Sequence, residues 1–342
     1  MLTLHICLTL IDTGFISNSY IIMIITSAHN PDSSIRNCSS SGGVFSMLAA
    51  DIIGKSGIIY GAAFDNTWSI KHIRIDSIEG LVSLRGSKYA FSEFTHSIGD
   101  VLHDLDSGKR VLFCGTPCQI AALRKQTGHN PRLLAVEIIC HGTPEPEFWQ
   151  QYLKELCSQK KRTIADIKRV CFRDKRTGWK DYSFTIEFND GKVFTQRHDN
   201  NLYMRAFSQN LTLRDACFHC PFKYPQGSTA DITLGDFWGI TQLAPDIDND
   251  LGTTIIIART TVGENAISFI DCTKSYTIES IAKYNPAITT SACKPSERQH
   301  FISETQTTPL IHVLKKYAKR PFSERIYLSL ARAKHNIFKI AK

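Results

Sequence analysis

Several features that would assign a chain to a simple class are missing from this sequence. Asp12, Asn18 and several hydroxyl residues interrupt the apolar segments of the first 25 residues, whereas a membrane span needs about 20 nearly uninterrupted apolar residues. A positively charged start followed by a clean apolar core and a cleavage site is also missing, so we expect no secretory signal. No Gly-x-Gly-x-x-Gly fingerprint of nicotinamide binding follows a predicted strand. We therefore expect a cytoplasmic protein that does not bind a nicotinamide through this fingerprint.

Cysteine, by contrast, is abundant. The chain has 342 residues, of which 42% are hydrophobic and 21% are charged, an ordinary globular composition. It contains 11 cysteines, an odd number, and without a secretory signal a disulfide framework is not expected. Reduced thiols that bind a metal or an iron–sulfur centre fit this composition better.

The positive charge of the chain is concentrated at one end. The formal net charge is +8, and residues 309–342 contain nine Lys or Arg residues and one acid, Glu324, which accounts for the whole excess. Because the body is near neutral, we expect no nucleic-acid partner. The tail alternates cations with apolar residues, which is typical of a helix that makes peripheral membrane contact or docks on an acidic partner. A helix packed on the protein body is an equally good interpretation.

Strand and helix patterns alternate along the chain. Apolar runs predict strands at 58–64, 111–113, 133–139 and 252–259, and amphipathic patterns predict helices at 98–106, 119–124 and 147–156. This order predicts an α/β fold with a mixed sheet flanked by helices, with α+β as the alternative. Residues 183–196 predict a hairpin added to the sheet, and the C-terminal tail is predicted to be helical. Functional residues should gather at the carboxyl ends of parallel strands.

A Cys-x-x-Cys pair, Cys217 and Cys220, is the strongest chemical signal. Two thiolates at this spacing can bind one metal centre, and iron and zinc centres often take four. Cys118 and Cys140 each follow a short apolar run. We expect three strand ends, those of these two cysteines and that of the pair, to converge at one sheet edge. Read alone, the pair fits a zinc knuckle or two unconnected thiols equally well.

Two polar glycine segments are candidates for ligand binding. Residues 39–43 lead into an apolar helix, and a helix N-terminus preceded by glycines attracts phosphate. Residues 85–89 combine cations, a hydroxyl and an aromatic ring beside Gly86. A capped helix and a surface turn are the plainer interpretations. A basic loop that contains Trp179 and Tyr182 suits either a flat anionic ligand or a solvated hairpin face.

Six motifs together resemble the beta-subunit family of coenzyme F420 hydrogenases and dehydrogenases. They are SSSGGVFS at 39–46, LRGSKYAFS at 84–92, CGTPCQIAAL at 114–123, EIICHG at 137–142, CFHCPF at 217–222 and ADITLGDFWG at 230–239. The resemblance implies an oxidoreductase that passes electrons between a 4Fe–4S cluster, FAD and a substrate, such as a deazaflavin coenzyme or a polysaccharide-pathway metabolite. Bacterial relatives carry a ferredoxin-like domain near the N-terminus, and residues 1–26 contain no such cysteine run, so we interpret them as an atypical segment.

The resemblance also implies site residues, a domain division and partners. The cluster ligands would be Cys118, Cys140, Cys217 and Cys220, and the FAD contacts would be Ser41, Gly42, Gly43, Gly86, Ser87, Lys88, Tyr89, Asp231 and Gly235. Residues 27–275 would form the FAD and iron–sulfur core, and residues 276–342 a basic helical region. The implied partners are a small-molecule substrate and a ferredoxin or iron–sulfur subunit, for which Lys223 would offer a positive contact. The rival functions are a ferredoxin-dependent reductase of another substrate and a non-catalytic zinc-binding scaffold.

Overall fold

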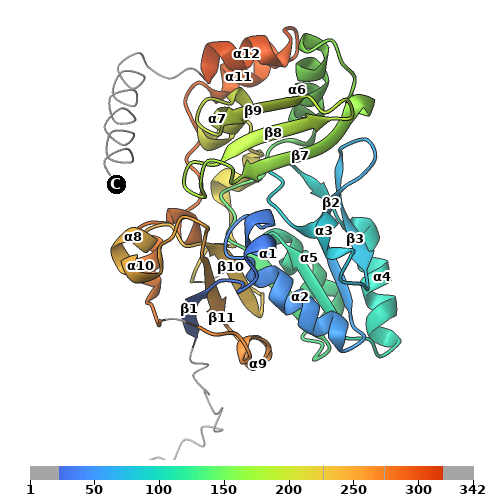
Figure 1. Ribbon diagram of the computed structural model, residues 1–342, viewed down its shortest axis with the longest axis vertical. Helices are drawn as coiled ribbons and strands as arrows, with labels where there is room; N and C mark the ends of the chain where they lie inside the picture. The colour runs from blue at the N-terminus through green and yellow to red at the C-terminus, as the bar shows by residue number, and fades with distance from the viewer. Residues whose placement is uncertain (1–22, 226, 273, 319–342) are drawn as a thin grey trace, which may run out of the picture.

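An eight-stranded mixed sheet is the largest element of the structure. The computed structural model describes residues 23–225, 227–272 and 274–318 (Figure 1). The strand order is β1-β11-β10-β6-β5-β2-β3-β4. In chain order the strands are β1 (Ile24–Ala28), β2 (Ile58–Phe64), β3 (Ile70–Ile75), β4 (Ser92–Glu93), β5 (Val111–Gly115), β6 (Leu133–Ile138), β10 (Ile232–Asp236) and β11 (Thr254–Ala258).

The centre of this sheet is parallel and its flanks are partly antiparallel. Strands β2, β5, β6 and β10 run in the same direction, whereas β11 is antiparallel to both β10 and β1, and β3 is antiparallel to β2. Central strands covered on both faces need continuous apolar runs, and every residue of β11 is buried. The predicted mixed sheet is therefore confirmed, although β11 lies inside the sheet between β1 and β10.

Helices cover both faces of the large sheet, as the strand–helix alternation predicts. Helices α2 (Val44–Gly54) and α9 (Thr261–Ile267) pack on one face, with Leu48 in the same cluster as Leu112 of β5. Helices α4 (Thr95–Asp106) and α5 (Pro117–Thr127) pack on the other face, where Phe113 of β5 is in their cluster. Neighbouring residues of β5 thus point to opposite faces, which is the normal side-chain alternation of a strand. The α/β class is confirmed.

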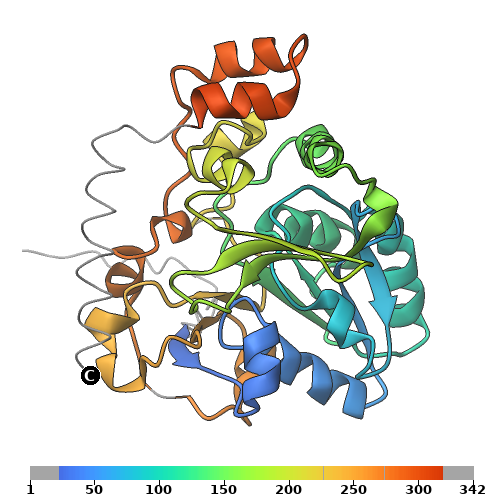
Figure 2. The same ribbon diagram turned by 45° about the horizontal axis from the view of Figure 1, so that its top comes forward.

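A second sheet forms a separate layer. Strands β7 (Ile167–Asp174), β8 (Ser183–Phe188) and β9 (Val193–Arg197) are antiparallel and are not paired with the large sheet. The predicted hairpin, β8–β9, therefore pairs with β7 instead of extending the large sheet. Helices α6 (Pro146–Gln159), α7 (Leu202–Ser208), α11 (Arg298–Thr305) and α12 (Leu310–Tyr317) surround this layer at the top of Figure 1, and Figure 2 shows α11 and α12 side by side at its far end.

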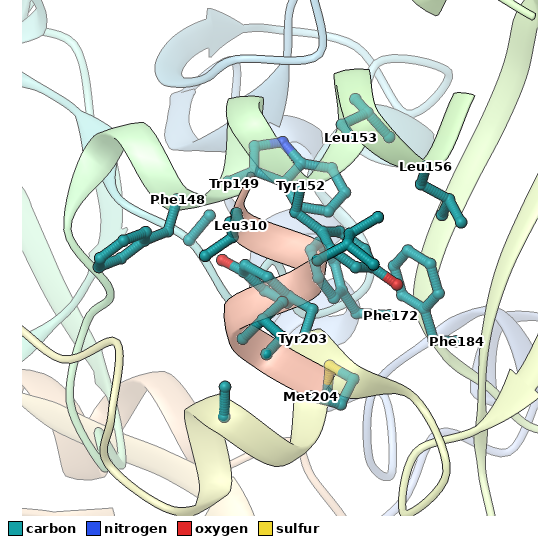
Figure 3. Packing of buried hydrophobic residues seen from close by; sticks show 14 of the residues in the cluster. Phe148, Trp149, Tyr152, Leu153, Leu156, Phe172, Phe184, Tyr203, Met204 and Leu310 are labelled. Carbon is teal, nitrogen blue, oxygen red and sulfur yellow. The ribbon is translucent and has the colours of Figure 1, made fainter. Parts of the chain in front are cut away.

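Aromatic side chains fill the core of this second layer (Figure 3). Trp149 of α6 lies with its ring centre 4.8 Å from that of Phe172 of β7 and 5.5 Å from that of Tyr203 of α7. Leu310 of α12 is fully buried in the same cluster. Large rings bury much apolar area and prefer offset or edge contacts, which explains how a three-stranded sheet can be covered stably by short helices.

The basic C-terminal tail, residues 309–342, begins as a packed helix. Leu310, Ile311, Val313 and Leu314 of α12 are buried, and α12 contacts α6 and α7. The packed interpretation therefore applies to residues 310–317, while the other cations predicted to contact a membrane, at 319–342, lie outside the described residues. No helix in the described part of the chain is long and apolar enough to cross a membrane. The division of the chain at residues 26 and 275 stays a prediction, and residues 1–22 are outside the described part.

The remaining elements are short. They are α1 (Ser33–Cys38), α3 (Leu81–Leu84), α8 (Ile240–Leu243), α10 (Ile278–Ala282) and 3-10 turns at Ile164–Asp166, Asp215–His219, Pro245–Ile247 and Pro286–Ile288.

Candidate functional site

A cavity of about 540 Å³ opens at the carboxyl edge of the parallel strands. Its walls include the last residues of three strands, which are Gly115 of β5, Ile138 of β6 and Asp236 of β10. Cavities of about 300–1,000 Å³ are typical of cofactor and small-molecule sites. The sequence prediction that functional residues gather at these strand ends agrees with this position.

The N-terminus of helix α2 faces this cavity. Gly43 is its N-cap residue, with φ of +83°, and no side chain caps the first turn. Gly43 and Ser46 both line the cavity. Gly42 lies behind the wall, where its amide donates a hydrogen bond of 2.9 Å to Thr254 Oγ1. Uncapped backbone amides at the positive end of a helix form a ready anion site.

The segment at 85–89 also lines the cavity and is held by its own lysine. Lys88 Nζ donates hydrogen bonds to the backbone oxygens of Leu84, Arg85 and Gly86 at 3.1–3.3 Å. Burial lowers the pKa of Lys88 to about 8. The ammonium group therefore fixes the loop, although the residue lines the cavity. Ser87 Oγ donates to Ser40 Oγ at 2.7 Å, which joins this segment to the serine–glycine loop.

Arg85 is a candidate ligand contact that the predicted FAD set lacks. Its Nε donates a hydrogen bond of 3.1 Å to Ser46 Oγ in the first turn of α2, and the residue lines the cavity. A guanidinium group next to a helix N-terminus strengthens the attraction for a phosphate. Arg85 belongs to the same motif as Gly86 and Lys88, so the signal was present, but the sequence could not show which cation faces the ligand.

The structure brings together seven of the nine predicted FAD contacts. Ser41, Gly43, Gly86, Ser87, Lys88, Tyr89 and Gly235 all line the cavity. Asp231 does not, because it lies just before β10, at the amino end of the strand whose carboxyl end carries Gly235. Its carboxylate is buried, pairs with Arg124 at 2.6 Å and accepts a hydrogen bond from the amide of Ala135. The structure thus gives Asp231 a role in joining the sheet to helix α5.

The four predicted ligand cysteines gather beside this cavity. Cys118 is exposed in the first turn of α5 and lines the cavity, whereas Cys140 follows β6 by two residues. Burial raises the pKa of Cys140 to about 12, and the charges of Cys118, Cys217 and Cys220 add to this effect, as expected for thiols that share one neighbourhood. No group of three or more His, Cys, Asp or Glu side chains in the described residues is arranged closely enough to hold a metal ion.

The Cys-x-x-Cys pair does not lie at a strand end, contrary to our expectation. Cys217 is part of the 3-10 turn at Asp215–His219, and Cys220 follows that turn. The amide of Thr143 donates to Cys217 Sγ at 3.3 Å, and the amide of Cys220 donates to Ser291 Oγ at 3.1 Å. Long-range hydrogen bonds therefore bring the pair back to the end of β6, a placement that local sequence patterns do not encode.

Lys223 holds the backbone next to the cysteines in place. Its Nζ donates hydrogen bonds to the backbone oxygens of Cys140, at 2.6 Å, and Ala287, at 2.7 Å. The predicted positive contact for an acidic partner is therefore not available in this arrangement, because the ammonium group clamps two loops. His141, which follows Cys140, lies within hydrogen-bond distance of Asn210 Oδ1 at 2.6 Å.

The basic hairpin loop is largely neutralised by acids. Arg169 pairs with Glu187 at 2.7 Å, and Lys180 pairs with Asp248 at 2.5 Å. Arg173 differs from these exposed cations because it is buried. It pairs with the cavity residue Asp236 and donates to the Tyr89 hydroxyl at 3.3 Å. The plainer interpretation of the loop therefore holds for Arg169 and Lys180, while Arg173 links the small sheet to the cavity wall.

Known proteins resemble this chain in sequence and in fold. Residues 108–283 match the family model for the C-terminal part of the coenzyme F420 hydrogenase/dehydrogenase beta subunit. A chain in a structure of the F420-reducing NiFe hydrogenase complex from Methanosarcina barkeri shares the fold, with a TM-score of 0.53 and 17% sequence identity. The similarity covers 83% of this chain and 92% of that chain. Among curated proteins, no sequence matches.

Proposed function

Because the chain belongs to the coenzyme F420 hydrogenase/dehydrogenase beta-subunit family, we propose that it is an iron–sulfur flavoprotein oxidoreductase. It would pass electrons between a 4Fe–4S cluster, FAD and a small-molecule substrate. A single observation carries the proposal: the four cysteines lie beside a cofactor-sized cavity, close enough together for Cys118 and Cys220 to add to the burial that raises the pKa values of Cys140 and Cys217, and Cys118 lines the cavity. Electron transfer requires this kind of proximity between two redox groups.

The four thiols fit an iron–sulfur cluster in their chemistry. Cys118, Cys140, Cys217 and Cys220 supply four sulfur donors, the ligand number that a 4Fe–4S cluster requires. The Thr143 amide already donates to Cys217 Sγ at 3.3 Å, and such hydrogen bonds to ligand sulfurs tune a cluster's potential. Bringing the thiols into direct contact with one centre would be coupled to its binding.

The cavity likewise fits a flavin dinucleotide in its chemistry. The amides at the start of α2 and the guanidinium of Arg85 would hold the phosphates, and the ring would lie beside the ends of β5, β6 and β10, which line the cavity. When bound, FAD supplies two-electron chemistry with a substrate and one-electron exchange with the cluster. The role of the chain is to hold both groups close and to keep water from them.

The substrate would be a deazaflavin coenzyme or a polysaccharide-pathway metabolite. The rival functions are a ferredoxin-dependent reductase of another substrate and a zinc-binding scaffold without catalysis. The first rival shares the same cofactors, so the two oxidoreductase functions differ only in the molecule that enters beside the flavin.

Cofactor content tests the proposal. The full chain should be produced anaerobically and assayed for iron, sulfide, zinc and flavin, together with its visible spectrum. We expect four irons and one FAD per chain, with broad visible absorption superimposed on flavin bands. A colourless protein that holds zinc and no flavin would instead establish the scaffold function and overturn the proposal.

A further inference from the structure

A second, small cavity lies directly behind Cys140. Its volume is about 20 Å³, and its wall contains Cys140, Glu137, Lys223 and Arg259. Ile138 and Ile139 line both this cavity and the large one, so these two residues separate them. The small cavity is thus adjacent to the cysteine site and distinct from the proposed flavin cavity.

Glu137 has one satisfied and one unsatisfied carboxylate oxygen. The residue is 3% exposed, and its Oε1 accepts hydrogen bonds from Ser228 at 2.8 Å and Thr233 at 2.7 Å. Its Oε2 is buried and has no partner among the described residues. An unpaired buried carboxylate oxygen is costly, so such a group is expected to bind water, a cation or a proton.

Lys223 contributes a donor to the same cavity wall. An ammonium group has three N–H donors, and hydrogen bonds to the oxygens of Cys140 and Ala287 use two of them. The third has no acceptor in the described part of the chain, and Lys223 lines the cavity with Glu137. A cavity of this volume holds about one water molecule, and a water between the two groups would satisfy both.

We propose that this cavity is a proton-storage site, in which Glu137 takes up a proton when an electron enters the four-cysteine centre. The inference rests on the proposed function only because an electron must enter the four-cysteine centre. The cavity and its unpaired carboxylate oxygen do not depend on that function. One electron passes from an external one-electron donor to the centre, and one proton passes from solvent to Glu137 Oε2 by way of the cavity water. No other bond is formed or broken, and both charges leave again on reoxidation.

The charges around Glu137 agree with this role. Burial raises the pKa of its carboxyl, while the hydrogen bonds from Thr233 and Ser228 and the charges of Arg259 and Lys223 act in the opposite direction. The titratable or charged groups that share its cavity wall are Cys140, Lys223, Tyr224 and Arg259. An added electron at the centre beyond Cys140 brings negative charge nearby, which favours the protonated carboxyl. Protonation of Glu137 therefore lowers the electrostatic cost of reduction.

A potentiometric titration at several pH values tests the coupling. The cluster of the reconstituted full chain is reduced stepwise with dithionite and mediators and followed by electron paramagnetic resonance. We expect the midpoint potential to fall as the pH rises, by up to one proton per electron, because reduction is easier when the proton is available. Glu137→Gln keeps the side-chain shape and should abolish this dependence.

A matched control separates this effect from a general change of charge. Burial also raises the pKa of Glu145, which lies outside the cavity wall, so Glu145→Gln should retain the wild-type dependence. A wild-type potential that does not change with pH, or an unchanged slope in Glu137→Gln, would overturn the proposal.

A second measurement does not need the cluster. Infrared spectra of the oxidised protein, recorded over a series of pH values, should show a carboxylic-acid band that ionises at a higher pH than an ordinary glutamate and that is missing in Glu137→Gln. If no variant or wild-type protein binds iron, the proposed function fails, and the infrared band still shows whether Glu137 stores a proton. The absence of the band in wild-type protein contradicts the proton site even where the cluster forms.

Discussion

At the scale of single residues, three lysines show the same arrangement. Lys88, Lys175 and Lys223 each direct the ammonium group at two or three backbone oxygens. Beside a glycine, or after a Cys-x-x-Cys pair, a lysine in a sequence suggests a contact with a ligand or partner. The acceptors of Lys175 and Lys223 come from distant loops, such as Leu251 and Ala287, so local sequence could not reveal that these lysines fix the chain.

The ligand cysteines can be tested one at a time. Cys140→Ala should lose most of the iron, because the remaining three thiolates cannot complete a four-cysteine cluster and leave it labile. Iron and sulfide per chain are measured after identical reconstitution. Cys114→Ala is the matched control, since its side chain lines the cavity but its charge does not contribute to the raised pKa of Cys140. Full iron retention in Cys140→Ala would refute the ligand assignment.

Asp231 offers a residue-scale test of structure against ligand binding. Asp231→Asn leaves the buried Arg124 without its counter-charge, which typically costs about 3–5 kcal/mol. We expect a much lower midpoint of thermal unfolding and an unchanged flavin affinity of the folded fraction. Asp246→Asn, which removes only an exposed pair with Lys274, should leave the midpoint unchanged. Loss of flavin binding without loss of stability would instead support the predicted FAD contact.

At the scale of elements, apolar periodicity predicted several of the strands and helices. The expected strand at 58–64 coincides with β2, and the helix expected at 98–106 begins three residues earlier, at Thr95. The pairing of strands was harder to predict, because it depends on contacts between residues far apart in the chain. The β8–β9 hairpin matched in its position but joined β7, and the Cys pair reached its site through a 3-10 turn.

The two ends of α2 give a matched pair of glycine substitutions. Gly43→Ala places a side chain where φ is +83°, with Ser39 Oγ only 3.1 Å from the new carbon, so the first turn should shift. We expect a flavin dissociation constant at least about tenfold higher, which corresponds to about 1.4 kcal/mol. Flavin fluorescence titration measures this change.

The control lies at the other end of the same helix. Gly54→Ala meets nothing within 4 Å and should stabilise the helix by about 0.5–1 kcal/mol without affecting flavin binding. Equal flavin affinity in Gly43→Ala and Gly54→Ala would show that the start of α2 does not hold the cofactor.

At the scale of the whole molecule, the proposed function requires an external electron donor. Cys157, Cys171, Cys272 and Cys293 are dispersed among both layers and form no second metal group within the described residues. Cys118 is exposed, so the proposed cluster would lie near the surface. A ferredoxin or an iron–sulfur subunit is the expected donor, since a cluster near the surface can exchange single electrons with such a protein.

A reduction experiment tests this dependence on a partner. In the reconstituted protein, reduced ferredoxin should bleach the flavin rapidly, whereas NADH or NADPH alone should act slowly or not at all, because no nicotinamide fingerprint is present in the sequence. Absorbance at the flavin bands is followed by stopped flow. The protein without its cluster is the control and should respond poorly to ferredoxin. Fast reduction by a nicotinamide would place a donor site within this chain.

Strand β10 has consequences for the genetics of this protein. Asp231, just before the strand, holds the fold through Arg124, whereas Gly235 and Asp236, at its far end, line the cavity. Substitutions that affect only stability and substitutions that also affect the cavity are therefore separated by a few residues of one strand. In a saturation screen, alleles at position 231 should be temperature-sensitive and rescued by growth in the cold. Alleles at 235 and 236 should also lower stability, because a side chain at 235 would meet Ile139 and Asp236 pairs with the buried Arg173. Growth in the cold should restore their protein level but not their activity, because both positions line the cavity.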